Sequence, residues 1–204
     1  MKLKILIAIP CMDMLHTAFA RSLVGLRVFG ECQFTFIQGS LVYDGRNRAC
    51  QIAEDGGFDR VLWLDSDMVF QPDLLERLSA DLDEGRECVA GLYFTRKAPI
   101  HPAAYGFVGM RGERPVAEPI RDWTEEPMRV EGVGFGGVLV TTDLIRRVKE
   151  TFGLPFSPIL GFGEDFSFCL RARELGAEIW VDPRVKMGHV GQVIFDEKDF
   201  ARGG

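Results

Sequence analysis

The sequence lacks the features that mark a cross-linked or membrane-embedded protein. Its five cysteines form no CxxC pair and are odd in number, which disfavours both a disulfide framework and a zinc ribbon. The first apolar run, Ile5 to Ile9, is too short for the core of a signal peptide and is closed by Pro10. No run reaches the length of a membrane span. We therefore expect a cytoplasmic protein with reduced cysteines and no membrane span.

Basic charge is also scarce, and a phosphate-binding loop is missing. The chain has 24 Lys and Arg against 30 Asp and Glu, which gives a formal charge of −6. A general nucleic-acid binder needs a basic face, so nucleic acid is not a favoured partner. The sequence contains no G-x-x-x-x-G-K-[ST], which excludes a P-loop NTPase. With 204 residues, of which 47% are hydrophobic and 26% charged, the composition fits a single globular domain over residues 1–204.

Apolar runs and helical patterns alternate along the first half of the chain. We expect strands at 3–9, 33–37, 60–64 and 87–94, separated by helices at about 15–28, 46–55 and 72–82. Such alternation implies parallel strands with right-handed crossovers. The predicted fold is α/β, with a mostly parallel, Rossmann-like sheet flanked by helices. In such folds ligands bind at the carboxyl ends of the strands.

Residues 95–131 break this alternation. The segment contains five prolines and no helical period, so we expect loops and short strands there, in a variable or mobile region. Beyond it the pattern predicts a strand at 138–141, helices at 142–151 and 164–175, a strand at 178–181 and a polar tail.

An acidic triplet, Asp65-Ser66-Asp67, directly follows the predicted strand RVLWL. Two carboxylates one residue apart at the mouth of a sheet can hold a hard divalent cation such as Mg²⁺ or Mn²⁺, which keeps open positions for substrate phosphates. A solvated turn that caps the next helix explains the same residues, so the motif alone leaves both interpretations open.

Two further polar features come late in the chain. Gly163-Glu164-Asp165 begins a predicted helix, where acidic residues favour the helix dipole. One of these two carboxylates could instead serve as a general base. His189 lies in a stretch flanked by Gly188 and Gly191, either as a loop residue or as a nitrogen ligand to the same cation.

Arginines and glycines supply the remaining signals. Arg46 and Arg48 follow a turn signal, Asp44-Gly45, and arginines at a helix N-terminus pair well with phosphate or carboxylate. A solvated basic face is the alternative. Glycines at 132, 134 and 137 match the dinucleotide fingerprint in their spacing, but they precede an apolar strand instead of opening a helix. We interpret them as letting the backbone pass close to a ligand or a neighbouring strand.

The order of these features resembles that of GT-A-fold glycosyltransferases, and most closely the family 2-like enzymes. A first strand ends at Ile9-Pro10, the acidic triplet ends another, the glycine-rich stretch 134–140 follows, and the Glu164-Asp165 pair and His189 come late. The resemblance spans about residues 3–191. It implies a divalent metal, usually Mn²⁺ or Mg²⁺, and a nucleoside-diphosphate sugar donor, with a UDP-sugar favoured. The acceptor stays open, and residues 95–131 would form part of its site or a lid.

The resemblance also implies roles for individual residues. Asp67 would bind the metal that bridges the donor diphosphate, Asp65 would share that metal site or contact the donor ribose, and His189 would complete it. Asp165 would be the base of an inverting enzyme, with Glu164 orienting the site or acting as the base instead. The other residues expected to contact the donor come from the first loop, the second helix, the triplet and the glycine-rich strand: Pro10, Cys11, Asp13, Arg46, Arg48, Ser66, Gly136 and Gly137.

Two other functions fit parts of the pattern. Asp65-Ser66-Asp67-Met68-Val69 resembles the first motif of haloacid-dehalogenase-type phosphatases, in which Asp65 would be a nucleophile, although that motif usually closes the first strand. A non-catalytic module that binds a sugar nucleotide is the third possibility. Processive polysaccharide synthesis is disfavoured, because the chain has no Q-x-x-R-W. Little room is left after His189 for the acceptor-binding extensions that many members of the family carry.

Overall fold

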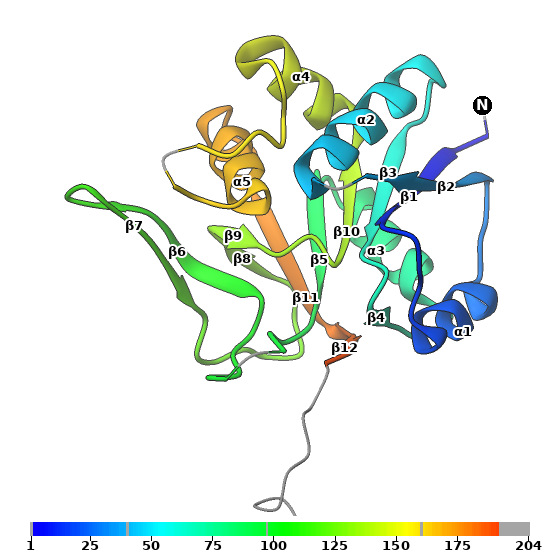
Figure 1. Cartoon of the computed structure of the whole chain (residues 1–204), viewed down its shortest axis with the longest axis horizontal. Coiled ribbons are helices and arrows are strands. Elements are labelled where there is room, and N and C mark those ends of the chain that lie inside the picture. Colours follow the sequence, from blue (N-terminus) through cyan, green and yellow to red (C-terminus); the bar gives the residue numbers. More distant parts are fainter. Residues whose placement is uncertain (1, 40, 97, 160, 192–204) are drawn as a thin grey trace, which may run out of the picture.

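The central feature of the fold is a sheet with helices on both faces (Figure 1). The computed structural model describes residues 2–39, 41–96, 98–159 and 161–191, so the predicted polar tail at 192–204 lies outside it. Five helices lie within these ranges: α1 (Thr17–Gly25), α2 (Val42–Asp55), α3 (Leu74–Asp83), α4 (Thr142–Phe152) and α5 (Glu164–Glu174). None of these helices is long and apolar enough to span a bilayer.

The main sheet in the described part of the chain has seven strands. In spatial order they are β2 (Glu31–Gln38), β1 (Lys4–Cys11), β3 (Arg60–Leu64), β10 (Gly137–Thr141), β5 (Cys88–Leu92), β11 (Ile179–Lys186) and β8 (Met128–Val130). Strands β2, β1, β3, β5 and β11 run in one direction, whereas β10 and β8 run in the opposite direction. The prediction of a mostly parallel sheet in an α/β fold is therefore confirmed.

Strand β1 shows how the sheet builds two cores. Its side chains alternate between the two faces, as they must in a strand. Leu6 and Ala8 join the apolar cluster under α2, α4 and α5, whereas Ile5, Ile7 and Ile9 join the cluster that includes residues of α1 and α3. All five are fully buried. A continuous apolar run is what a strand covered on both faces requires.

The segment at 95–131 contains a longer antiparallel hairpin than the expected short strands. Strand β6 (Ala104–Arg111) pairs with β7 (Arg114–Pro119) across a turn at Gly112, which has a φ of +61°. Strand β9 (Gly132–Val133) pairs with the other side of β6. Figure 1 shows the hairpin projecting away from the main sheet.

Several predicted boundaries were wrong. Helix α2 begins at Val42, so Asp44-Gly45 lies inside the helix and not in a turn before it. Asp44 favours the helix dipole from this first turn, and Gly45 is buried. Helix α3 begins at Leu74, two residues after Pro72.

Helix α1 is shorter than expected and β11 is longer. Helix α1 spans only Thr17–Gly25, because Leu26 is already extended. Strand β11 continues to Lys186 through a shift of register between Asp182 and Lys186. The longer β11 leads into β12 (Gly188–His189), which pairs with the two-residue strand β4 (Met68–Val69).

Candidate functional site

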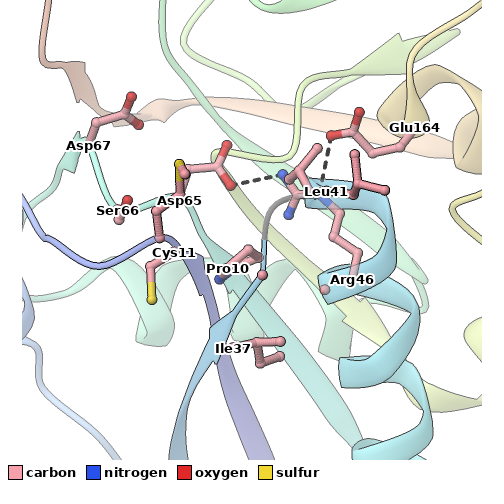
Figure 2. A pocket seen from close by; sticks show the side chains of 13 residues that line it. Pro10, Cys11, Ile37, Leu41, Arg46, Asp65, Ser66, Asp67 and Glu164 are labelled. Atoms are coloured by element: carbon pink, nitrogen blue, oxygen red, sulfur yellow. Dashed lines mark hydrogen bonds and ion pairs between the residues drawn. The ribbon is translucent and has the colours of Figure 1, made fainter.

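A cavity of about 360 Å³ opens at the carboxyl ends of β1, β2 and β3 (Figure 2). Its position follows the rule for open α/β sheets, in which ligands bind beyond the carboxyl ends of the strands. Residues of five segments line it: Pro10, Cys11, Met12, Ile37, Gly39, Leu41, Val42, Gly45, Arg46, Asp65, Ser66, Asp67 and Glu164. We call it the first cavity. It gathers five of the predicted donor-contacting residues, Pro10, Cys11, Arg46, Asp65 and Ser66, together with Asp67 and Glu164.

A buried arginine lies at the base of the first cavity. The Arg46 side chain is 2% exposed, and its Nη2 lies 2.8 Å from Oδ1 of Asp65. Its Nε lies 3.4 Å from Oε1 of Glu164. Figure 2 shows Asp65 and Glu164 approaching the guanidinium from different elements. Burial opposes the charge on Arg46, but these carboxylates hold its pKa above the ordinary value.

The guanidinium of Arg46 also lies against three aromatic rings. Its Cζ is 5.7 Å from the ring centre of Trp63, 5.5 Å from that of Phe135 and 5.9 Å from that of Phe156. Cations within about 6 Å of a ring face are attracted to it. Nη1 is buried and has no hydrogen-bond partner among the described residues. Arg46 is therefore held as an internal counter-ion for the site.

A second cavity of about 390 Å³ lies on the other side of Asp67 and His189. It is lined by the segment that follows β5 and by one residue each from the stretch before β10, from α5 and from β12: Tyr93, Thr95, Arg96, Ala98, Pro99, His101, Ala103, Tyr105, Gly134, Asp165 and His189. Most of these residues belong to the proline-rich segment whose pattern predicted a variable region. No motif in the sequence indicated that Tyr93, Arg96 or Tyr105 would face a site.

The two acidic residues at the start of α5 face different cavities. Glu164 lines the first cavity and Asp165 the second. Burial raises the pKa of Asp165 to about 6, and the neighbouring charge of Glu164 adds to the effect. The backbone amide of Phe166 donates to Oδ1 of Asp165 at 2.8 Å, which fixes the orientation of the carboxyl. A carboxyl with this pKa can accept a proton near neutral pH.

Asp67 and His189 meet where the two cavities adjoin. Pairing of β12 with β4 sets His189 opposite Met68, and Nε2 of His189 lies 3.4 Å from Oδ2 of Asp67. Arg96 forms an ion pair with the same Oδ2. Burial disfavours the charged form of Asp67, but His189 and Arg96 outweigh it and hold its pKa below the ordinary value. The contact with Asp67 raises the pKa of His189.

The ring orientation of His189 suits a metal ligand. Its Nδ1 lies 3.0 Å from the backbone carbonyl oxygen of Phe94. A carbonyl oxygen only accepts, so Nδ1 carries the hydrogen, and Nε2 faces Asp67 with its lone pair when the ring is neutral. Metal-binding histidines are commonly fixed in this way by a hydrogen bond from the other ring nitrogen.

Asp67 and His189 therefore fit two ligands of a divalent cation. Carboxylate oxygen and imidazole nitrogen are compatible with Mn²⁺, and a cation bound by few protein ligands keeps positions for phosphate oxygens. Asp65 is instead directed toward Arg46. Within the described ranges, no three His, Cys, Asp or Glu side chains are arranged to hold a metal. Of the three expected metal ligands, Asp65, Asp67 and His189, the structure thus brings only Asp67 and His189 into contact.

Two predicted donor contacts from the first half of the chain do not line either cavity. Arg48 is exposed, and its Nη1 donates to the carbonyl of Gln38 at 3.2 Å. Asp13 is also exposed; burial of the Cys11 thiol raises its pKa, and the charge of Asp13 adds to this effect. Of the paired alternatives Arg46 and Arg48, only Arg46 lies at the site.

Gly136 and Gly137 make room for side chains of the protein itself. A Cβ on Gly136 would lie 2.9 Å from Sδ of Met68 and 3.0 Å from the ring of Tyr93. A Cβ on Gly137 would lie 2.3 Å from Cε of Met187. The close approach in the described structure is thus to neighbouring segments, which was one of the two interpretations of these glycines.

Comparison with known proteins supports the fold. No protein-family model matches the chain, and no curated protein sequence matches it. The structure is similar to the crystal structure of A197 from STIV, with a TM-score of 0.62 and 20% identity over 96% of this chain and 87% of that one. It is also similar to GalNAc-T7 with UDP, GalNAc and Mn²⁺, with a TM-score of 0.66 and 12% identity over 95% of this chain and 44% of that one. The fold is accordingly GT-A-like.

Proposed function

We propose that the chain is a metal-dependent glycosyltransferase that moves a sugar from a nucleoside-diphosphate sugar to an acceptor hydroxyl, with inversion and with Asp165 as the base. One observation carries the proposal. Two cavities adjoin at the contact between Asp67 and His189. Glu164 lines the first cavity and Asp165 lines the second. Two cavities with a shared edge are what the transfer of a group between two substrates requires.

The first cavity suits the donor. Its walls combine apolar groups of Ile37, Leu41 and Pro10, which can cover a nucleobase, with the polar side chains of Ser66 and Asp67. Asp67 in turn contacts His189, which lines the second cavity. The similarity to a structure that holds UDP and Mn²⁺ supports a UDP-sugar as the donor. Asp67 and His189 would hold the cation, Mn²⁺ or Mg²⁺, which neutralises charge that develops on the leaving diphosphate.

The charge balance of the site supports a divalent cation. Among the described residues, four carboxylates, those of Asp65, Asp67, Glu164 and Asp165, lie together with two guanidinium groups, those of Arg46 and Arg96. When all four are ionised and His189 is neutral, two negative charges are left without a partner in this set. Buried charge without a partner is costly, and a bound divalent cation removes that cost.

The second cavity suits the acceptor, because Asp165 faces it. The base must reach the proton of the attacking hydroxyl, and Asp165 is the carboxyl of the pair that lines this cavity. Glu164 is held by Arg46 at 3.4 Å on the other side, which favours an orienting role for Glu164. The rings of Tyr93 and Tyr105 offer apolar surface to an acceptor.

A phosphatase that uses Asp65 is less well supported. Asp65 follows β3, the third strand of the chain, and its Oδ1 is engaged by Arg46 at 2.8 Å. Burial raises the pKa of Asp65 in spite of Arg46, which disfavours the ionised form that a nucleophile needs. A non-catalytic sugar-nucleotide module is separated from the enzyme only by turnover.

The proposal is tested by ligand-dependent thermal stability, with UDP, GDP and ADP, each with and without Mn²⁺. A ligand that binds only the folded state raises the unfolding midpoint, by about 2.7 kcal/mol of stability at 100 times its Kd. For a chain of this length that is a shift of roughly 5–10 °C. We expect the shift with UDP plus Mn²⁺, and its loss in Asp67→Ala. Asp122→Ala is the matched control, because Asp122 is an exposed carboxylate that lines neither cavity.

Turnover is measured on the same variants as release of UDP from a panel of UDP-sugars. We expect Asp165→Asn to keep the thermal shift and to lose release. If the wild-type protein shows the thermal shift but releases UDP from none of these UDP-sugars, the result would favour the binding module. Absence of a shift with every nucleotide, together with Asp65-dependent release of phosphate from p-nitrophenyl phosphate, would favour the phosphatase.

A further inference from the structure

Arg96 occupies the position on Asp67 that faces His189. Its Nη1 forms an ion pair with Oδ2 of Asp67, the same oxygen that lies 3.4 Å from Nε2 of His189. Nη1 also lies 3.4 Å from the backbone carbonyl oxygen of Val190, which accepts from it. The carboxylate oxygen that would bind a cation is therefore already bound by a guanidinium of the same chain.

The segment that carries Arg96 also fixes the histidine. Phe94, two residues earlier, accepts from Nδ1 of His189 at 3.0 Å and so directs Nε2 toward Asp67. The same short stretch after β5 thus orients one proposed metal ligand, His189, and binds the other, Asp67. The side chain of Arg96 is 45% exposed, so it can leave Asp67 without disturbing the core.

We infer that Arg96 competes with the divalent cation for Asp67. A guanidinium and a divalent cation cannot both approach Oδ2 closely, because they repel each other and need the same lone pairs. Arg96 lines the second cavity, so a displaced guanidinium stays beside the two substrates. This inference rests on the proposed function only in assigning Asp67 and His189 to a cation.

The competition makes cation binding depend on the nucleotide. The cation alone must displace Arg96 from its only carboxylate partner among the described ion pairs. A diphosphate brings new negative charge to which the displaced Arg96 can pair, since arginine binds phosphate as readily as carboxylate. The cation and the nucleoside diphosphate therefore bind more tightly together than apart, and part of this coupling depends on Arg96.

The test is direct titration of Mn²⁺ into protein stripped with EDTA, followed by the electron paramagnetic resonance signal of free Mn²⁺. We expect Arg96→Gln to bind Mn²⁺ about tenfold more tightly than the wild-type protein, which corresponds to 1.4 kcal/mol. Arg96→Lys keeps the positive charge but lacks the planar guanidinium with its paired donors. We expect its Mn²⁺ affinity to lie between those of the wild-type protein and Arg96→Gln. Asp67→Asn in the Arg96→Gln background should abolish binding.

Arg129→Gln is the matched control. Arg129 is 65% exposed, forms a single ion pair with Glu178 at 3.1 Å and lines neither cavity. The substitution Arg129→Gln removes the same positive charge outside both cavities. Its effect on Mn²⁺ affinity therefore measures the effect of the change in net charge alone. We expect this effect to stay below about twofold at physiological salt. Circular dichroism confirms that each variant is folded.

Two results would overturn the inference. Unchanged or weaker Mn²⁺ binding by Arg96→Gln would show that Arg96 does not compete, while leaving the cation site and the proposed function intact. Absence of Mn²⁺ binding by every variant would remove the cation from Asp67 altogether. In that case binding of UDP in the presence of EDTA decides separately whether the donor cavity, and with it the proposed transferase, survives.

Discussion

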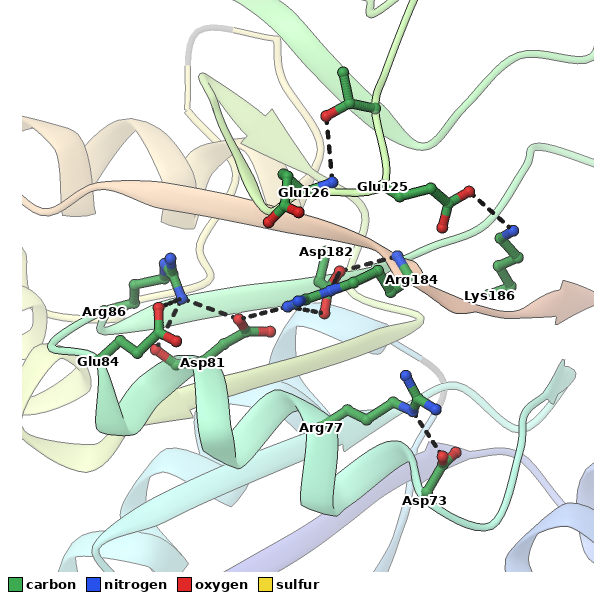
Figure 3. A network of polar contacts seen from close by, with 11 residues as sticks. Asp73, Arg77, Asp81, Glu84, Arg86, Glu125, Glu126, Asp182, Arg184 and Lys186 are labelled. Carbon is green, nitrogen blue, oxygen red and sulfur yellow. Dashed lines mark hydrogen bonds and ion pairs between the residues drawn. The ribbon is translucent and has the colours of Figure 1, made fainter.

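Carboxylates and guanidinium groups gather in two clusters within the described part of the chain, and the two clusters are balanced differently. The cluster at the cavities sets Arg46 between Asp65 and Glu164, with Asp165 next to it. The other cluster joins α3 to β11 (Figure 3). Its two buried carboxylates, Asp81 and Asp182, are matched by two guanidinium groups, those of Arg86 and Arg184, and the exposed Glu84 adds a contact with Arg86.

In the second cluster each carboxylate has a guanidinium partner within the chain, although Oδ2 of Asp81 has no hydrogen-bond partner among the described residues. Nη1 of Arg86 lies 2.9 Å from Oδ1 of Asp81, and Nε of Arg184 lies 2.9 Å from Oδ1 of Asp182. Asp81 and Asp182 are almost fully buried, and each has a guanidinium partner. Buried carboxylates that each have a guanidinium partner need no added cation, whereas an excess of carboxylates favours one. The contrast supports a structural role for the Asp81 cluster and a binding role for the Arg46 cluster.

The largest expected effect follows from removing Arg46. Arg46→Met leaves two carboxylates at the base of the first cavity without their partner, and breaking a buried pair typically costs about 3–5 kcal/mol. We expect this loss in the free energy of unfolding, measured by urea denaturation. Arg48→Met is the control, because Arg48 is exposed and should change stability by less than about 0.5 kcal/mol. Equal effects of the two substitutions would contradict the contrast.

The next effect concerns Asp165, the proposed base. Asp165→Asn should lower the rate of sugar transfer by roughly 10²- to 10⁴-fold, the usual contribution of a general base. Because burial raises the pKa of Asp165 to about 6, the wild-type rate should rise with pH as this carboxyl ionises and level off above that value. The measurement is kcat/KM between pH 4.5 and 8. Loss of the rising limb in Glu164→Gln, with its retention in Asp165→Asn, would assign the base to Glu164.

A smaller effect separates packing from ligand binding at the glycines. Gly137→Ala places a Cβ 2.3 Å from Cε of Met187, a flexible side chain that must shift. Overpacking typically costs about 1–3 kcal/mol, and we expect the lower end. Gly106→Ala is the control, since its nearest contact would be Ile120 Cγ2 at 3.8 Å. Unchanged stability with weaker UDP binding in Gly137→Ala would show that this glycine serves the ligand.

The glycines also show what the sequence can and cannot predict. Their spacing next to an apolar strand revealed a close approach, but not whether the neighbour was a ligand or Met187. Likewise, a run such as 138–141 predicts a strand without its direction, so the antiparallel insertion of β10 between β3 and β5 could not be foreseen. The parallel direction of the other strands could be predicted, because strand and helix alternate along the first half of the chain.

The site was predictable where it depends on strand ends. Asp65 and Asp67 follow a buried strand, and such ends gather at one edge of a sheet. Arg46 and Arg48 could not be separated, because the sequence placed the start of α2 four residues too late. Arg96 and Tyr105 escaped notice, since only long-range packing of the segment after β5 brings them to Asp165 and His189.

The smallest expected effect tests the balanced cluster through pH. Burial, with the nearby carboxyl of Asp182 adding to it, raises the pKa of Asp81 above 3.8. The folded state therefore binds more protons than the unfolded state between pH 4 and the raised value, and stability contributed by Asp81 falls as pH rises through that window. Asp81→Asn removes this dependence.

We expect the free energy of unfolding of Asp81→Asn to change less between pH 4.5 and 7.5 than that of the wild-type protein, by on the order of 1 kcal/mol. At pH 7.5 the substitution itself should cost little, because Arg86 keeps its contacts with Glu84 at 2.7 Å and with the backbone carbonyl of Asp81 at 3.3 Å. Urea denaturation at the two pH values gives the comparison. An undiminished pH dependence would mean that Asp81 is ionised at both pH values, which is the behaviour of a carboxylate fully neutralised by Arg86 and Arg184. That result would show that Asp81 is charge-compensated at both pH values. The cluster would then differ even more from the acidic cluster around Arg46.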